Sequence, residues 1–453
     1  MYKFIVGVSI MGGLERKSKL SAVLLATALL ASACSGGGDK QTGEGSTAPK
    51  PQEQAPKPVK LQVLAPSGVN EQWFMDRYGK SIQAKYPHYS FEVLETNTNT
   101  IQAIVTEKRK IDLIITSFAG LRSSIKPVEL HSDLNELIKK HGFDTNRVEK
   151  AYLDTIQNLD KGKTSGLPLY DLSMLLYYNK DIFDKFGVPY LTDKMTWEDL
   201  LSVANRLTRV DGSVQYRGFV TAASHLVVGN QASLGFFDPT GDKVAIDAEK
   251  WKQYFELMKP FYTMPGYNAT KPMISGNAIK DAFFKEKTSA MFVMYNSDAP
   301  KPEDGMNWDA VKMPELKSAP GVGSQPYPVY IDIASTSEHR DEAFLSLAVL
   351  LTDEVQTMLA SDFAYISPLK SQAVKAAFGK NAAQWKGKNI GAITALKPAS
   401  PPAYVGEYYT IGQTAMTNAM LSYFVGEKDV NTAIRDATEE TAKKLEEEKA
   451  KKK

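Results

Sequence analysis

Cys34, the single cysteine of this 453-residue chain, lies where a lipid could be attached to its thiol. An apolar run at residues 20–30 and the small residues 31–33 precede it, and three positive charges lie within residues 16–19. The run is too short to cross a bilayer comfortably, which favours a cleaved signal peptide over a permanent helix. We therefore predict a signal peptide at residues 1–33 and a lipid on Cys34. The alternative is an ordinary secretory signal that contains a cysteine.

The stretch that follows has the composition of a flexible tether. Residues 34–59 are rich in glycine, serine, threonine and proline, with no large aliphatic residue apart from Val59. Such a segment cannot bury a core, so it is expected to hold a globular body at a distance from the membrane. Residues 1–10 add nothing to the signal, which makes Met11 a second candidate start.

Patterns typical of catalysis are missing from the sequence. The histidines stand at positions 88, 131, 141, 225 and 339, and no two of them have metal-ligand spacing. A lone histidine such as His225 is more often structural than functional. The sequence contains no serine-nucleophile elbow, glycine-rich phosphate loop or zinc-protease motif. We therefore predict no enzyme, cofactor or metal, although paired carboxylates for glycoside hydrolysis would come together only in the fold.

Strands and helices alternate along the first part of the body. Residues 61–65, 90–94 and 111–116 have the apolar pattern of strands, and helices are expected after Asn70 and at 101–107. This order predicts a parallel sheet with helices on its faces. Because ligands bind beyond the carboxyl ends of such strands, the loops at 66–73 and 116–120 are the first candidates for a binding site.

The length and the net charge of the chain limit the possible domain organisation and partners. About 390 residues follow the tether, more than one core usually holds, so two domains are expected. A net charge of +2 and the lack of a basic stripe with interleaved aromatics argue against a nucleic-acid partner.

The most specific stretch is residues 165–207. It contains Leu-Pro at 167–168, LLYYNKD at 175–181 and TWED at 196–199, where Thr196 can cap a helix. In these motifs the chain resembles the extracellular solute-binding proteins of ABC importers, in particular the carbohydrate-associated family that includes maltose-binding protein. Three further blocks resemble the same family in the same order, at residues 276–296, 330–356 and 404–445.

The resemblance implies a two-lobed α/β fold of the type II periplasmic-binding-protein class. Lobe one would comprise residues 60–168 and 326–366, and lobe two residues 169–325 and 367–453. Two or three hinge crossings would join them, near 165–170, 327–332 and 364–368. It also implies that hinge closure traps a carbohydrate, that membrane permease subunits recognise the closed form, and that the protein is monomeric. With the lipid, this places the chain on the outer face of the cytoplasmic membrane.

Sugars require flat aromatic faces for their CH surfaces and planar polar groups for their hydroxyls. The candidates at the expected cleft are Asn70, Glu71, Trp73, Ser117, Phe118, Tyr170, Tyr295, Asn296, Tyr327, Tyr330, Asp332, Tyr404 and Tyr408. Trp73 could equally belong to the core, and Asp332 could instead form a buried hydrogen bond. Tyr177, Tyr178 and Trp197 are expected to pack in the interior.

Three classes of function stay open from the sequence. The first is a lipid-anchored receptor that captures a carbohydrate, most naturally an oligosaccharide, for an ABC importer or for signalling. The second is a receptor of the same fold for a polyamine, an anion or iron. The third is a surface-anchored glycan hydrolase, which would turn its substrate over.

Overall fold

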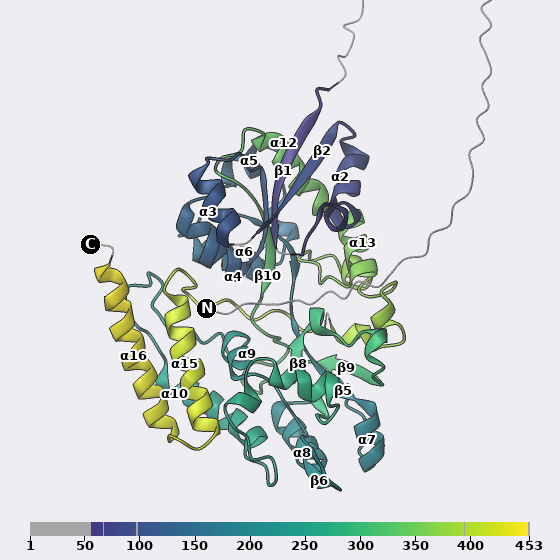
Figure 1. The fold of residues 1–453 in the computed structure, drawn as a ribbon, viewed down its shortest axis with the longest axis vertical. Coiled ribbons are helices and arrows are strands. Elements are labelled where there is room, and N and C mark those ends of the chain that lie inside the picture. The colour runs from purple at the N-terminus through teal and green to yellow at the C-terminus, as the bar shows by residue number, and fades with distance from the viewer. Residues whose placement is uncertain (1–55, 67, 97, 394, 452–453) are drawn as a thin grey trace, which may run out of the picture. The chain divides into compact units, whose positions relative to one another are not determined.

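The computed structural model describes residues 56–66, 68–96, 98–393 and 395–451. The predictions for the signal peptide, for Cys34 and for most of the tether fall outside these residues. Two sheets and their covering helices make up the described body, one for each lobe (Figure 1).

The sheet of lobe one has five strands in the order β2-β1-β3-β10-β4. Their bounds are β1 Val59–Pro66, β2 Tyr89–Thr96, β3 Leu113–Ser117, β4 Leu167–Asp171 and β10 Pro328–Ile333. β1 is parallel to β2 and β3, with Val63 opposite Val93 and Leu113, so the three strands predicted from the sequence are confirmed. β10 is antiparallel to both β3 and β4, so the expected parallel sheet is only partly right. β10 enters this sheet on its return from lobe two, and it therefore runs against the other strands.

Helices cover both faces of this sheet because its strands are apolar on both sides. Leu61 and Val63 of β1 pack with α12, whereas Leu64 belongs to a second cluster that includes residues of α3 and α6. The helices of this lobe are α1 Glu71–Phe74, α2 Lys80–Lys85, α3 Thr98–Thr106, α4 Phe118–Gly120, α5 Asn135–Lys140, α6 Lys150–Leu159, α12 Arg340–Leu350 and α13 Asp353–Phe363. Two π-helical segments, η1 Met75–Gly79 and η2 Leu121–Ile125, continue α1 and α4.

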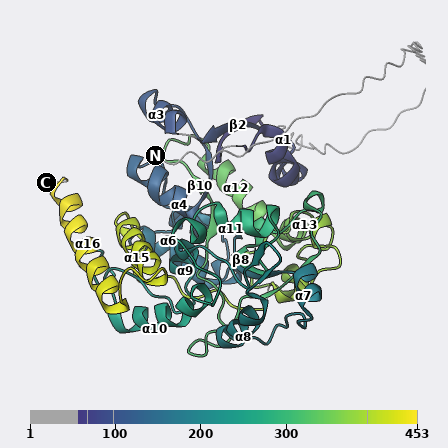
Figure 2. The same cartoon turned by 60° about the horizontal axis from the view of Figure 1, so that its bottom comes forward.

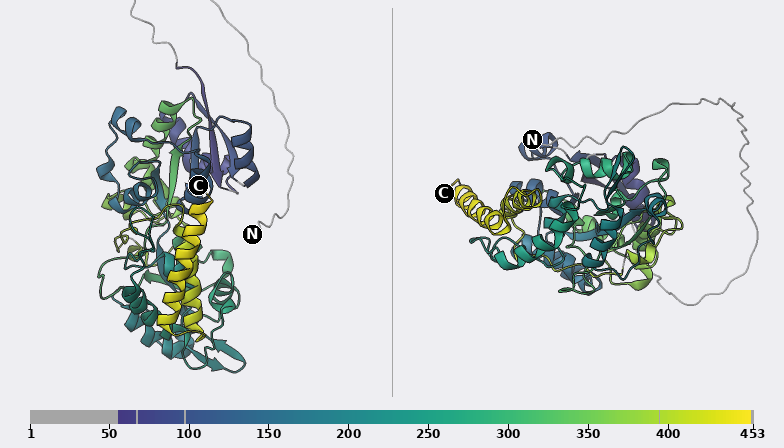
Figure 3. Two further views of the ribbon diagram at one scale, coloured as in Figure 1. Left: turned by 90° about the vertical axis from the view of Figure 1, so that its left-hand side faces the viewer. Right: turned by 90° about the horizontal axis from the view of Figure 1, so that it is seen from below.

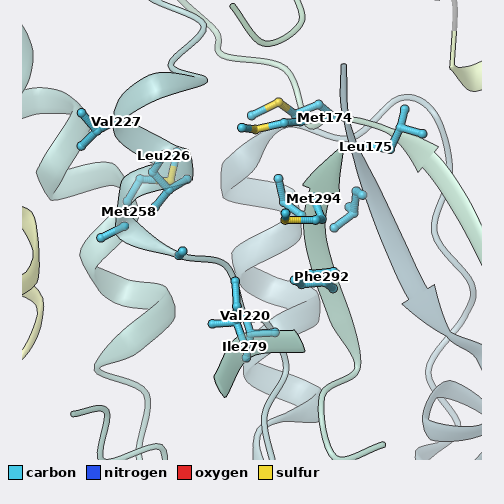
Figure 4. Packing of buried hydrophobic residues seen from close by; sticks show 14 of the residues in the cluster. Met174, Leu175, Val220, Leu226, Val227, Met258, Ile279, Phe292 and Met294 are labelled. Carbon is cyan, nitrogen blue, oxygen red and sulfur yellow. The ribbon is translucent and has the colours of Figure 1, made fainter. Parts of the chain in front are cut away.

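Lobe two contains a smaller antiparallel sheet. Its order is β8-β5-β9, formed by β5 Met174–Asn179, β8 Met291–Tyr295 and β9 Trp308–Lys312, and a separate hairpin joins β6 Arg209–Asp211 to β7 Val214–Tyr216. Every residue of β5 is buried, which confirms the interior packing of Tyr177 and Tyr178. Figure 4 shows Met174, Leu175 and Met294 of this sheet among the buried side chains of a cluster that also contains Leu226 and Met258.

The helices of lobe two match the local signals in the sequence. They are α7 Lys180–Phe186, α8 Trp197–Leu207, α9 Ala223–Val228, α10 Ala248–Met258, α11 Ala278–Lys280, α15 Tyr409–Phe424 and α16 Val430–Ala450. α14 Gln372–Lys375 instead lies against lobe one, where Lys375 forms an ion pair with Glu149. Thr196 and Asp199 form the predicted capping box of α8, and Trp197 is fully buried. α15 and α16 run alongside each other (Figures 2 and 3). Among the described residues, no single helix is long and apolar enough to cross a membrane, although the bent pair of α12 and α13 passes that test together.

Candidate ligand-binding site

Asp171 holds the connections between the two lobes together. It ends β4, and its carboxylate accepts hydrogen bonds from the backbone N–H of Tyr327 at 2.9 Å and from the Ser173 hydroxyl at 2.5 Å. Its own N–H donates to the carbonyl of Ile366 at 2.9 Å. Burial raises the pKa of Asp171 to about 6, although the bonds from Ser173 and Tyr327 favour the ionised form. One residue, through its side chain and its backbone N–H, thus joins all three expected crossings.

A first group of aromatic side chains surrounds Arg77, and we call it the Arg77 region: Trp73, Arg77, Tyr170, Phe363 and Tyr365. The Arg77 guanidinium lies 4.0 Å from the ring centre of Trp73 and 4.3 Å from that of Phe363. Tyr170 stacks on Tyr365 with 4.0 Å between ring centres. Burial raises the pKa of Tyr365, and the charge of Arg77 opposes that rise. Two of the predicted residues, Trp73 and Tyr170, therefore lie in this region.

A second group surrounds Arg122, and we call it the Arg122 region: Phe118, Arg122, Tyr295, Tyr327 and Tyr409. The Arg122 guanidinium lies 4.6 Å from the ring centre of Tyr409 and 5.5 Å from that of Phe118. Tyr295 and Tyr327 have ring centres 5.4 Å apart. Arg122 and Phe118 follow β3 in lobe one, whereas Tyr295 ends β8 and Tyr409 begins α15 in lobe two. This region therefore combines side chains of both lobes.

The Arg122 side chain is unusually well buried for a cation. Only 8% of it is exposed, and its Nε has no hydrogen-bond partner among the described residues. Desolvation lowers the pKa of the guanidinium, and Tyr409, Tyr327 and Tyr404 oppose that change. A buried donor without an acceptor is a feature that a ligand can satisfy.

The loops after the first and third strands begin short helices. Asn70 accepts a hydrogen bond from the N–H of Trp73 at 2.9 Å, and Ser117 accepts one from Gly120 at 3.2 Å. Asn70 and Glu71 are exposed, while Ser117 is half-buried. Both loops thus follow the carboxyl ends of their strands, as predicted. The side chains of Asn70 and Ser117 cap the short helices that begin there.

The remaining candidates from lobe two border the Arg122 region. Asn296 is buried and donates to the carbonyl of Ala364 at 3.2 Å, a bond between the end of β8 and a crossing segment. Tyr404 is buried, and its hydroxyl accepts from the N–H of Tyr408 at 3.3 Å. His225 meets the edge of Tyr295 with 5.7 Å between ring centres, and burial lowers the pKa of His225 to about 4.

Tyr330 and Asp332 are not brought to either region. Both belong to β10, a central strand covered on both faces, and both are fully buried. The Tyr330 hydroxyl donates to the carbonyl of Tyr152 at 2.6 Å, and Asp332 accepts from the N–H of Ile333 at 2.6 Å. Burial raises the pKa of Asp332 well above its usual range. We therefore assign these two side chains to the interior of lobe one rather than to a ligand.

Arg77, Arg122, Tyr365 and Tyr409 were not among the residues predicted from the sequence. Arg122 lies two residues beyond the predicted loop at 116–120, so a slightly wider window would have included it. Arg77 and Tyr365 are neighbours only through the pairing of distant segments, which no local signal reveals.

The chain belongs to the bacterial extracellular solute-binding protein family, whose model matches residues 68–357. It is similar in structure to a sugar transporter from Rhizobium etli in an open conformation, with 21% identity, coverage of 86% of this chain and 99% of the other, and a TM-score of 0.66. A cyclic alpha-maltosyl-1,6-maltose binding protein from Arthrobacter globiformis has 15% identity, the same coverage and a TM-score of 0.66. An ABC substrate-binding protein from Listeria monocytogenes in complex with cycloalternan has 16% identity, covers 86% and 99%, and has a TM-score of 0.65. These similarities confirm the predicted type II, two-lobed α/β fold.

Proposed function

We propose that this protein captures a carbohydrate, most naturally an oligosaccharide, and delivers it to the permease of an ABC importer. The observation that carries the proposal is the Arg122 region, where aromatic rings of both lobes meet a buried guanidinium. The names of the structural neighbours, which describe sugar-binding proteins and one bound cycloalternan, support the same class of ligand.

The side chains of this region suit the chemistry of a sugar. The half-buried rings of Tyr295 and Tyr327 offer apolar faces to the CH surface of a pyranose, and their hydroxyls can donate or accept hydrogen bonds. The Arg122 guanidinium adds donors in a fixed planar arrangement. A sugar would therefore find both apolar and polar partners within one region.

Contact with both lobes gives a physical reason for closure. A sugar held by Arg122 of lobe one and by Tyr295 and Tyr409 of lobe two binds a conformation with the lobes together more tightly than one with the lobes apart. The hinge would consist of the segments joined by Asp171, which can change their dihedral angles while the two sheets stay rigid. The permease would then recognise the closed form.

The alternatives fit this region less well. A polyamine requires carboxylates, whereas the charged group at the centre of the Arg122 region is a cation. A glycan hydrolase requires two facing carboxylic acids, and the buried carboxylate of Asp171, which acts on Tyr295, is occupied by hinge hydrogen bonds. We further propose that the lipid on Cys34 and the tether at residues 34–59 keep the monomeric protein at the outer face of the cytoplasmic membrane.

Binding can be tested on the complete chain, purified in detergent, with a panel of mono- and oligosaccharides followed by isothermal titration calorimetry and recovery of the sugar. We expect reversible binding of one sugar series, with the sugar recovered unchanged. Tyr295→Ala should then weaken binding about 10- to 100-fold, because burying one aromatic side chain contributes about 1.5–3 kcal/mol. Tyr190→Ala, which removes a tyrosine that is 41% exposed, should leave the affinity unchanged.

Two results would contradict the proposal. If no sugar binds while a polyamine or an iron chelate does, the carbohydrate ligand is wrong. If the sugar is recovered cleaved, the protein is a hydrolase.

A further inference from the structure

Arg122 stands out among all the cations that the structure describes. It is the one arginine or lysine in residues 56–66, 68–96, 98–393 and 395–451 whose side chain is more than nine-tenths buried. Within these same residues it forms no ion pair with an acidic side chain, and its Nε has no hydrogen-bond partner. By contrast, the nearby Lys280 forms an ion pair with Asp298.

Burial of an unpaired charge costs free energy that the surrounding groups must offset. The rings of Phe118 and Tyr409 lie within 5.5 Å and 4.6 Å of the guanidinium, but aromatic faces replace only part of its lost hydration. The neighbouring Tyr327 and Tyr404 supply hydroxyls and no carboxylate. Among the residues that the structure describes, the Arg122 guanidinium is therefore buried without an ion pair to an acidic side chain.

We infer that Arg122 receives the carboxylate of an acidic sugar, so that the ligand is an oligosaccharide containing a uronic acid. This inference rests on the proposed function, because it names the substrate class of the same site. A guanidinium matches the two oxygens of a carboxylate with two parallel hydrogen bonds. The rings of Tyr295, Tyr327 and Tyr409 then face the apolar surface of the sugar that carries it.

The charge balance favours a carboxylate over a phosphate. One unpaired cation matches one negative charge, whereas a phosphate group carries about two at neutral pH. Arg77, the next guanidinium in this part of lobe one, is already enclosed between the faces of Trp73 and Phe363. A single carboxylate is therefore the anion that this region balances.

The experiment compares di- and trisaccharides of galacturonate and glucuronate with their neutral galactose and glucose counterparts, on the complete chain in detergent, by calorimetry. We expect the best uronate oligosaccharide to bind at least tenfold more tightly than its neutral counterpart, and to weaken as the salt concentration rises. Arg122→Met should abolish this preference, and Arg122→Lys should restore only part of it because it keeps the charge and loses the planar fork.

Arg217→Met is the matched control. Arg217 also has a buried Nε without a partner and lies 5.8 Å from the ring centre of Tyr267, outside both regions. Its loss should leave the preference for uronates unchanged, and the melting temperatures of both variants show that they are folded.

The outcomes separate this inference from the proposed function. Equal or tighter binding of neutral sugars overturns the acidic ligand and leaves carbohydrate capture intact. Binding of acetate or of inorganic phosphate as tight as that of the uronates overturns it as well, since the sugar would then contribute nothing. Failure of every sugar to bind overturns the proposed function itself.

Discussion

The Arg77 and Arg122 regions contain similar side chains arranged for different purposes. In each, a guanidinium lies against aromatic rings and forms no ion pair with a described acidic side chain. In the Arg77 region the cation is enclosed between two rings, Trp73 and Phe363, at 4.0 and 4.3 Å. All of its members come from lobe one or from the crossing segments. Its guanidinium is therefore covered by rings from this part of the molecule, although the Nε of Arg77, like that of Arg122, has no hydrogen-bond partner among the described residues.

The Arg122 region differs in the burial of its cation and in the origin of its side chains. Its cation is more deeply buried, and its contacts come from α15 in lobe two as well as from the turn after β3. We interpret an aromatic and cationic cluster as structural when its rings come from one lobe and the crossing segments. It becomes a candidate site when both lobes contribute side chains around a deeply buried cation.

Asp171 lies between the two regions, because it follows Tyr170 of the first and binds the N–H of Tyr327 of the second. We expect Asp171→Ala to lower the free energy of unfolding by about 2–4 kcal/mol, more than any other substitution that we propose, since two donors lose their buried acceptor. Urea unfolding followed by circular dichroism measures this change. Asp242→Ala, which removes an exposed carboxylate, should stay within about 0.5 kcal/mol of the wild type.

A small effect of Asp171→Ala on stability would mean that the two regions are not held by a shared hinge. The Arg77 and Arg122 regions would then be independent parts of the molecule.

Arg77→Met tests whether the Arg77 region is structural. We expect the free energy of unfolding to fall by about 1–2 kcal/mol, because the guanidinium loses two aromatic partners, while sugar affinity stays within threefold. Arg122→Met should instead weaken sugar binding more than it lowers the free energy of unfolding. Thermal unfolding and calorimetry on the same two preparations give both quantities, and Arg435→Met, which removes an exposed cation, is the control.

A more than tenfold loss of affinity in Arg77→Met, without a loss of stability, would show that both regions bind ligand. The distinction between filled and unfilled clusters would then be wrong for this molecule.

Local patterns predicted the elements of the fold well. The helix start at Thr196 and the buried strand around Tyr177 both depend on residues close in sequence. The direction of β10 was not predictable in this way, because it depends on a strand that returns from the other lobe. The lobe boundaries stay predictions.

The candidate site was predicted in part for the same reason. Tyr170, Tyr295 and Tyr327 lie at strand ends and crossings, which the resemblance located, whereas Trp73 lies in α1, after the loop that the order of strands and helices indicated. Tyr330 belongs to a strand whose residues are buried on both faces. The sequence of such a strand does not reveal whether a given side chain points into a cleft or into the core. Arg122 and Tyr409 meet only when segments from the two lobes come together. The spacing of residues along the sequence does not predict contacts between such distant segments.

The last difference between the two regions is their response to pH, because the Arg122 region borders a half-buried histidine. His225 faces Tyr295, and Asp298 and Lys280 act on it with opposite signs. Since burial lowers the pKa of His225 to about 4, from 6.5, the unfolded chain binds a proton that the folded chain does not. Its contribution to stability is therefore present above pH 6.5 and is lost as the pH falls toward 4.

Between pH 7 and 5.5 the wild type should lose about 1 kcal/mol more stability than His225→Gln, as measured by urea unfolding at both pH values. The stability difference between the wild type and Arg77→Met should not change over the same interval, because a guanidinium stays charged throughout. Equal pH dependence of the wild type and His225→Gln would show that the histidine is hydrated or paired in solution. The Arg122 region would then be as insensitive to pH as the Arg77 region, and burial of its polar groups would be less complete than the geometry indicates.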